Sequence, residues 1–217
     1  MSGDAGNDLL VGGAGNDILV GGVVTNSGSA FVASGDVLWG HTEFSGRGAS
    51  DADQFRIVAP SAANKAVETF GGSGSFEFNT GTLIVDFASG SDTIRFAASM
   101  VGDNDTLLEN VAVQDAPGAF AAGAEMVIFR TDAAASFNSF NTLLPFASAA
   151  VTGVIGSADA AFAVGAERLF VVDNGVSSAI FQFTSANADA VVTVDELSLL
   201  VVVNGSASLG AGDFTLF

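Results

Sequence analysis

The sequence predicts a mainly β fold with a few short helices. Apolar residues occur in short runs such as GTLIVDF, EMVIFRTD and RLFVVDNG, each bounded by Gly, Asn, Asp or Ser. These runs have the length of strands, and the residues around them favour turns. Of the 217 residues 49% are hydrophobic, which is enough for a sizeable core. The Ala-rich stretches 131–136 and 147–166 are candidates for short helices or loops.

A nine-residue phrase opens the chain and occurs twice. GDAGNDLLV at 3–11 aligns with GGAGNDILV at 12–20, and both fit the G-G-x-G-x-D-x-U-x repeat. Glycine permits a tight turn in which carbonyl oxygens face inward, while Asp8 and Asp17 add carboxylate oxygens. Such all-oxygen ligands suit calcium, which takes about six to eight of them. Leu10 and Leu19 would point between two short strand layers.

These repeats resemble the RTX family of calcium-binding repeats in bacterial secreted proteins. The resemblance implies a short parallel β-roll whose turns lie on alternate sides, with an ion between turns two repeats apart. In the third turn Asn26 stands at the Asp position, Val24 replaces a Gly, and Asp36 begins a later echo of the phrase. Expected calcium ligands are Gly3, Ala5, Asp8, Gly12, Ala14, Asp17, Gly21, Asn26 and Asp36. The alternative is a Gly- and Asp-rich hairpin pair that binds nothing.

Two downstream segments also resemble this family. GASDADQFRIV at 48–58 resembles the G-A-D-x-F-x-F phrase that caps such rolls. LIVDFASGSDTIRF at 83–96 resembles the I-x-D-F-x-x-G-x-D-x-I-D-L segment that follows the roll in serralysin-type and haemolysin-type proteins. Asp86 and Asp92 flank its Gly turn and would hold a further calcium ion. A polar turn capped by Asp side chains would give the same pattern.

A weaker cation candidate lies between 185 and 196. Its spacing follows the EF-hand loop, with Asn187, Asp189 and Glu196 as ligands. Ser185 stands where an EF-hand has Asp, and Ala190 replaces the Gly of the sharp turn. The other interpretation is an acidic loop before a strand or helix.

The last 30 residues resemble the C-terminal region of type I secretion substrates. The family pattern has an acidic turn, a D/E-E-L-x-L-L element, a Gly turn and a short acidic-then-apolar tail. The residues that match are Asp195, Glu196, Leu197, Asp213, Phe214, Leu216 and Phe217. The resemblance implies an uncleaved export signal and a type I secretion apparatus as partner. A last β-strand docked on a sheet is the alternative.

Charge and motif content restrict the function. The net charge is -18, which disfavours nucleic acid and anionic membranes, and no apolar run is long enough to span a membrane. The chain has a single His, no Cys and no G-x-S-x-G motif, so we expect no enzyme. No basic, apolar N-terminal signal is visible, and the start within a repeat suggests part of a longer chain.

The sequence thus predicts three segments. Residues 1–45 would end a calcium β-roll, 46–115 would form a β-rich capping segment, and 116–217 a β-rich, sandwich-like or roll-like C-terminal domain with the export signal at about 185–217. The predicted function is a non-catalytic calcium-binding module that is secreted and folds on calcium outside the cell. Alternatives are a self-assembling extracellular structural protein that binds itself, or the tail of a secreted protease or lipase.

Overall fold

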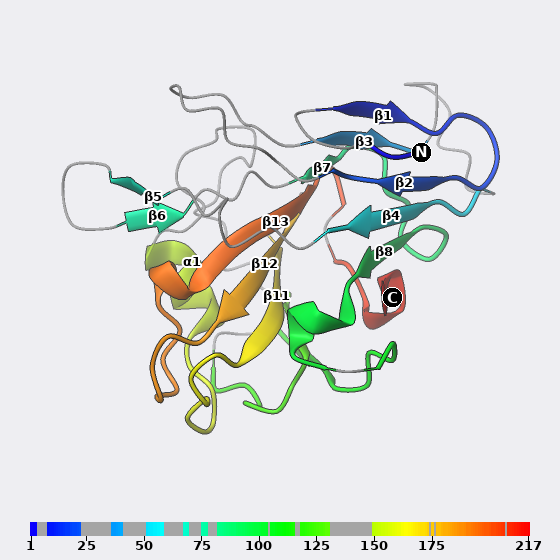
Figure 1. The fold of residues 1–217 in the computed structure, drawn as a ribbon. Helices are drawn as coiled ribbons and strands as arrows, with labels where there is room; N and C mark the ends of the chain where they lie inside the picture. The colour runs from blue at the N-terminus through cyan, green and yellow to red at the C-terminus, as the bar shows by residue number, and fades with distance from the viewer. Residues whose placement is uncertain are drawn as a thin grey trace.

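The computed structural model describes residues 1–3, 8–22, 36–40, 51–58, 67–69, 75–77, 82–103, 105–115, 118–130, 149–173, 175, 177–206 and 208–217. Strands dominate and the helices are short, which confirms the predicted fold class (Figure 1). The helical elements are η2 (Ala98–Val101), α1 (Ala149–Ile155), η4 (Val194–Glu196) and η5 (Ala211–Asp213). Within the described residues, no helix is long and apolar enough to cross a membrane.

Most strands belong to two sheets. The eight-stranded sheet has the order β1-β3-β7-β13-β12-β11-β10-β9 and the four-stranded sheet the order β14-β8-β4-β2. In the first, the strands are β1 (Leu9–Val11), β3 (Val37–Trp39), β7 (Thr82–Ile84), β9 (Val111–Gln114), β10 (Met126–Phe129), β11 (Glu167–Asp173), β12 (Ser178–Thr184) and β13 (Leu197–Val203). In the second they are β2 (Ile18–Val20), β4 (Gln54–Ile57), β8 (Thr93–Phe96) and β14 (Phe214–Leu216). A separate hairpin pairs β5 (Val67–Thr69) with β6 (Ser75–Glu77).

The chain alternates between the two sheets and so winds a parallel β-roll. Four pairs of strands follow one another as rungs: β1 and β2, β3 and β4, β7 and β8, and finally β13 and β14. All neighbours within the roll are parallel. The fourth rung therefore comes from the C-terminus of the chain, about a hundred residues after the third.

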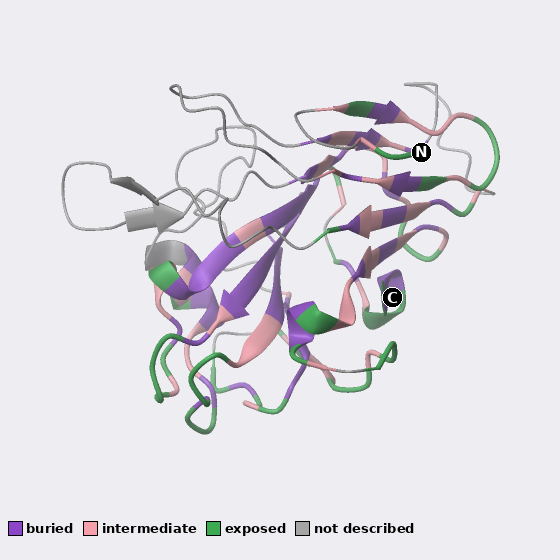
Figure 2. Cartoon of the chain, viewed as in Figure 1, coloured by how far each residue is buried: buried purple, intermediate pink, exposed green. Residues whose placement is uncertain are grey.

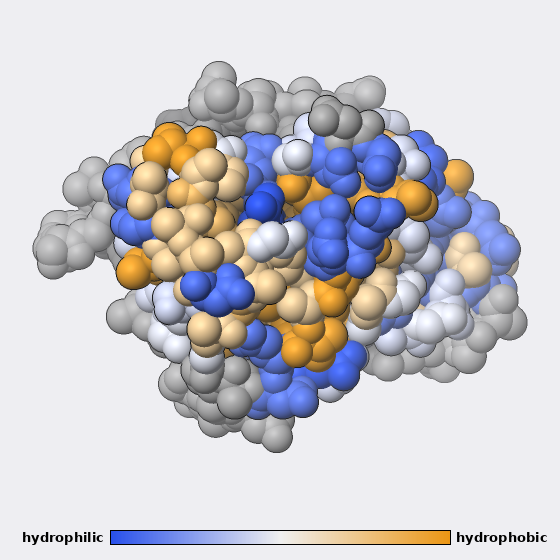
Figure 3. Space-filling view, turned by 90° about the horizontal axis from the view of Figure 1, so that it is seen from below, coloured by the Kyte–Doolittle hydropathy of each residue, from blue (hydrophilic) through white to orange (hydrophobic). Residues whose placement is uncertain are grey.

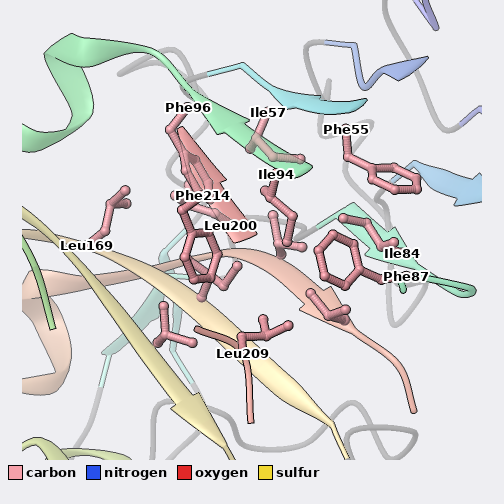
Figure 4. Packing of buried hydrophobic residues seen from close by; sticks show 14 of the residues in the cluster. Phe55, Ile57, Ile84, Phe87, Ile94, Phe96, Leu169, Leu200, Leu209 and Phe214 are labelled. Carbon is pink, nitrogen blue, oxygen red and sulfur yellow. The ribbon is translucent and has the colours of Figure 1, made fainter. Parts of the chain in front are cut away.

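The strand register aligns one inward side chain from each rung in each layer. In the eight-stranded sheet this column is Leu10, Leu38, Ile84 and Val203, and in the four-stranded sheet it is Leu19, Phe55, Ile94 and Phe214. All eight side chains are at most 5% exposed. The predicted inward positions of Leu10 and Leu19 are thus confirmed. Figure 4 shows how the aromatic and aliphatic members of this core pack together.

The central strands of the large sheet are buried on both faces (Figure 2). Along β10 and β11, residues alternate between the core of the roll and a second core, which is Phe-rich. Helix α1 packs on this second core through Val151, Val154 and Ile155. Both faces are covered, as expected for strands made of continuous apolar runs.

Strands from all three predicted segments share these sheets. The eight-stranded sheet takes strands from 1–45, 46–115 and 116–217, and so does the four-stranded sheet. The boundaries of the segments themselves stay predictions.

Candidate metal centre

The turns of the roll lie along two edges. We call forward turns those that lead from the eight-stranded to the four-stranded sheet, at 12–17, 40–53, 85–92 and 204–213. Return turns, at 3–8 and 21–36, lead back into the large sheet; the connection from β4 to β7, which lies largely outside the described residues, is not counted among them. Every one of these six turns ends with an Asp immediately before the next strand. These residues are Asp17, Asp53, Asp92 and Asp213 on the forward edge, and Asp8 and Asp36 on the return edge.

Hydrogen bonds join these aspartates from rung to rung. The backbone N–H of Asp17 donates to Oδ1 of Asp53 at 2.8 Å, and that of Asp53 donates to Oδ1 of Asp92 at 3.0 Å. On the return edge the N–H of Asp8 donates to Oδ1 of Asp36 at 3.0 Å. Each carboxylate therefore holds the start of the strand next to it in register.

A glycine faces each carboxylate in the first four turns. Gly3 lies against Asp8, Gly12 against Asp17, Gly21 against Asp36 and Gly40 against Asp53. At Gly12 a Cβ would lie 2.6 Å from the carbonyl oxygen of Gly40 and 2.8 Å from Oδ2 of Asp17. Oxygens of two successive forward turns thus converge beside Gly12, where a side chain would fill the space.

Among the described residues of the repeats, two carboxylate oxygens have no hydrogen-bond donor. Oδ2 of Asp8 and Oδ2 of Asp17 are both buried and unpartnered. A buried anionic oxygen without a donor is costly, and most such groups in proteins are satisfied. A bound cation would satisfy both. Because they are oxygens, and a carbonyl oxygen lies beside Asp17, the arrangement fits a hard cation such as calcium.

Backbone carbonyls must supply much of any such site. Among the described residues, no group of three or more His, Asp or Glu side chains could hold a metal. Gly3, Gly12 and Gly21 begin their turns, and Ala14 lies exposed in the first forward turn. Ala5 and Asn26, two of the predicted ligands, lie outside the described residues. In the third repeat it is Asp36, at the end of a longer turn, that occupies the position next to the strand.

The forward edge concentrates negative charge. Burial, together with the charges of Asp92, Asp17 and Asp86, raises the pKa of Asp53 to about 6, although the hydrogen bond from the N–H of Asp17 opposes this shift. Burial also raises the pKa of Asp92, together with the charges of Asp86 and Asp213. A cation on this edge would offset the repulsion and favour the ionised carboxylates.

Asp86 and Asp92, the predicted downstream pair, connect the third forward turn to the second. Asp86 accepts a hydrogen bond from the N–H of Gly40 at 2.8 Å. Asp92 accepts from the N–H of Asp53 and, through Oδ2, from the N–H of Ala88 at 2.8 Å. The two residues belong to one turn, and their carboxylates hold it to its neighbour.

The fourth forward turn is closed by protein donors. The carboxylate of Asp213 is 3% exposed and accepts from the N–H of Gly90, the N–H of Gly210 and the hydroxyl of Ser89. The hydroxyl of Ser206 donates to the carbonyl oxygen of Phe87 at 2.8 Å. These hydrogen bonds attach the C-terminal turn to the third turn.

In the loop with EF-hand spacing, the acidic side chains also accept hydrogen bonds from protein donors. The buried carboxylate of Glu196 accepts from the N–H of Ala186 at 2.8 Å and from the N–H and hydroxyl of Thr193 at 2.9 Å. Asp189 accepts from the N–H of Val191, and the carbonyl oxygen of Asn187 accepts from the hydroxyl of Ser185. These bonds close the loop on itself.

A comparison with known protein families identifies the repeats at the start of the chain. The family model of the RTX calcium-binding nonapeptide repeat (4 copies) matches residues 1–24. The start of the chain thus carries RTX repeats, as predicted, and such repeats bind calcium. They are typical of secreted proteins and are generally non-catalytic. Neither a curated protein nor a solved structure matches the chain.

Proposed function

We propose that this chain is a non-catalytic, calcium-stabilised module of an exported protein, and that calcium completes the folding of its β-roll outside the cell. The observation that carries the proposal is the pair of buried, donor-free oxygens on Asp8 and Asp17. Both lie in the segment that matches the RTX repeat. Without calcium these oxygens oppose folding, and with calcium their binding energy adds to stability.

Circular dichroism with calcium and with a chelator tests this function. We expect the far-ultraviolet strand signal and the melting temperature to rise on addition of millimolar calcium. Magnesium at the same concentration is the control, because it demands a smaller, near-octahedral site. Identical folded spectra and identical melting with calcium and with chelator would contradict the proposal.

We further propose that the C-terminal segment, about 185–217, acts as an export signal before the chain folds. In the folded chain Glu196, Leu197, Asp213, Phe214 and Leu216 are all buried, so a secretion apparatus would read them in the unfolded chain only. Deletion of the residues after Asp189 is expected to abolish export through a type I apparatus while expression persists. Undiminished export of the truncated chain would refute the signal.

Self-assembly remains a second candidate, and the apolar surface favours it. Seen from below, the molecule shows apolar side chains between separate polar patches (Figure 3). Large exposed side chains on the described surface include Leu107, Val164 and Val191. Light scattering on calcium addition tests this function, since assembly would raise the signal and a monomeric module would not.

A further inference from the structure

Two arginines lie side by side on the outer face of the four-stranded sheet. The strand register pairs Arg56 in β4 with Arg95 in β8, and their neighbours in the same row are Val20 and Thr215. Like charges in register on adjacent strands repel each other. The four strands of this sheet contain no Asp or Glu, so the sheet itself supplies no counter-charge.

The guanidinium groups are only partly satisfied. Arg56 makes no hydrogen bond or ion pair in the described part of the chain, and Arg95 donates to the side chain of Gln54 at 3.4 Å and to the carbonyl oxygen of Leu216 at 3.0 Å. The Nε–H of each arginine is buried without an acceptor. Arg168 differs, because its guanidinium group donates to the carbonyl oxygens of Ala122 and Val101. Arg130 donates to the carbonyl oxygen of Leu209 at 3.3 Å and likewise has a buried Nε–H without an acceptor.

Both guanidinium groups lie over the ring of Phe217. Its centroid is 5.4 Å from Cζ of Arg56 and 5.7 Å from Cζ of Arg95. An aromatic face attracts a cation but carries no net charge, so the ring itself does not neutralise the two guanidinium groups. This ring fixes both guanidinium groups at one place beside the end of the chain.

We propose that Arg56 and Arg95, held by Phe217, form a binding site for a single oxyanion such as a carboxylate, sulfate or phosphate group. Guanidinium groups bind such groups through paired, charge-assisted hydrogen bonds. The chain has only 6 Lys and Arg against 24 Asp and Glu, and this excess repels a densely charged polymer. The site therefore favours an isolated oxyanion on a small molecule or on a sparsely charged glycan.

Titration of the calcium-loaded, ¹⁵N-labelled protein with sodium sulfate at constant ionic strength tests the site. The Nε–H resonances of Arg56 and Arg95 are expected to shift along a saturable curve. In Arg56→Gln the saturable shift at Arg95 is lost. Arg56→Lys retains the charge but not the planar fork, so we expect sulfate to bind about tenfold more weakly. A linear shift in the wild type, or an unchanged curve in Arg56→Gln, would overturn the proposal.

Further experiments with other ligands and with a Phe217 variant distinguish which kind of oxyanion binds and what each residue contributes. Sodium acetate replaces sulfate to test a carboxylate, and heparin replaces it to test a polyanion; saturable binding of heparin alone would overturn the single-oxyanion site. Phe217→Ala leaves both arginines in place, so sulfate is expected to bind it more weakly but still saturably. If the arginines serve only to hold Phe217, no variant and no wild-type sample binds sulfate, while all variants lose stability. Melting curves verify that each variant is folded.

Discussion

Replacement of Asp17 by Asn is expected to act in opposite directions on the calcium-free and calcium-bound protein. In the calcium-free chain, Oδ2 of Asp17 is a buried charged acceptor without a donor. Such a group costs about 1–3 kcal/mol. Because Asp17 is only partly buried, its removal should raise the free energy of unfolding by about 1 kcal/mol, at the low end of that range.

In the calcium-bound chain the same substitution removes a charged ligand. Calcium at about a hundred times its dissociation constant adds about 2.7 kcal/mol to the free energy of unfolding. If the affinity falls by about a hundredfold, the same calcium concentration adds only about 0.4 kcal/mol. The calcium-dependent gain in stability should therefore nearly vanish at this site.

Urea unfolding of decalcified and calcium-loaded protein measures both effects. Asp115→Asn is the matched control, because Asp115 is exposed and its replacement changes the net charge equally. We expect the control to change both states by a few tenths of a kcal/mol. If Asp17→Asn destabilises the calcium-free protein, or if it behaves like the control with calcium, the role given to the orphaned oxygen is wrong.

Three further predictions follow from the turns. Gly12→Ala places a Cβ 2.6 Å from the carbonyl oxygen of Gly40, and should lower the free energy of unfolding in urea by about 1–3 kcal/mol. Gly123→Ala is the control, because a Cβ there would meet no atom within 4 Å, and it should not cause this loss. Asp213→Ala removes the acceptor of three hydrogen bonds and should lower the free energy of unfolding by about 1–3 kcal/mol. We expect calorimetry to give an unchanged calcium dissociation constant. Weaker calcium binding would contradict the closure of this turn by protein hydrogen bonds. The third concerns pH: burial raises the pKa of Asp53 from 3.8 to about 6, so the folded state binds this proton more tightly than the unfolded state. The stability of decalcified protein should thus fall as the pH rises from 4 to 6. An increase in stability over that range would contradict this prediction.

Much of the N-terminal roll could be predicted from the sequence. A Gly after one strand and an Asp before the next are visible in the two N-terminal repeats, and the inward positions of Leu10 and Leu19 follow from their spacing. This works because the first two turns are short, so the repeat keeps its period. The same Gly and Asp positions persist at Gly21 with Asp36 and at Gly40 with Asp53, but longer turns separate them.

The C-terminal rung could not be placed from the sequence. Strand pairing between β7 and β13, and between β8 and β14, joins segments more than a hundred residues apart, and no local pattern encodes that distance. A signal was present in Asp92 and Asp213, each immediately before a strand of the same sheet. Their shared role is visible only once the fold brings Gly90 and Ser89 to the carboxylate of Asp213.

Calcium should stabilise the roll through its N-terminal turns. Amide hydrogen exchange of the protein, followed by mass spectrometry with calcium and with chelator, measures this effect strand by strand. We expect calcium to increase protection in β1 and β2 far more than in β11 and β12, which lie between two cores. Equal protection of β1 and β2 with and without calcium would contradict it.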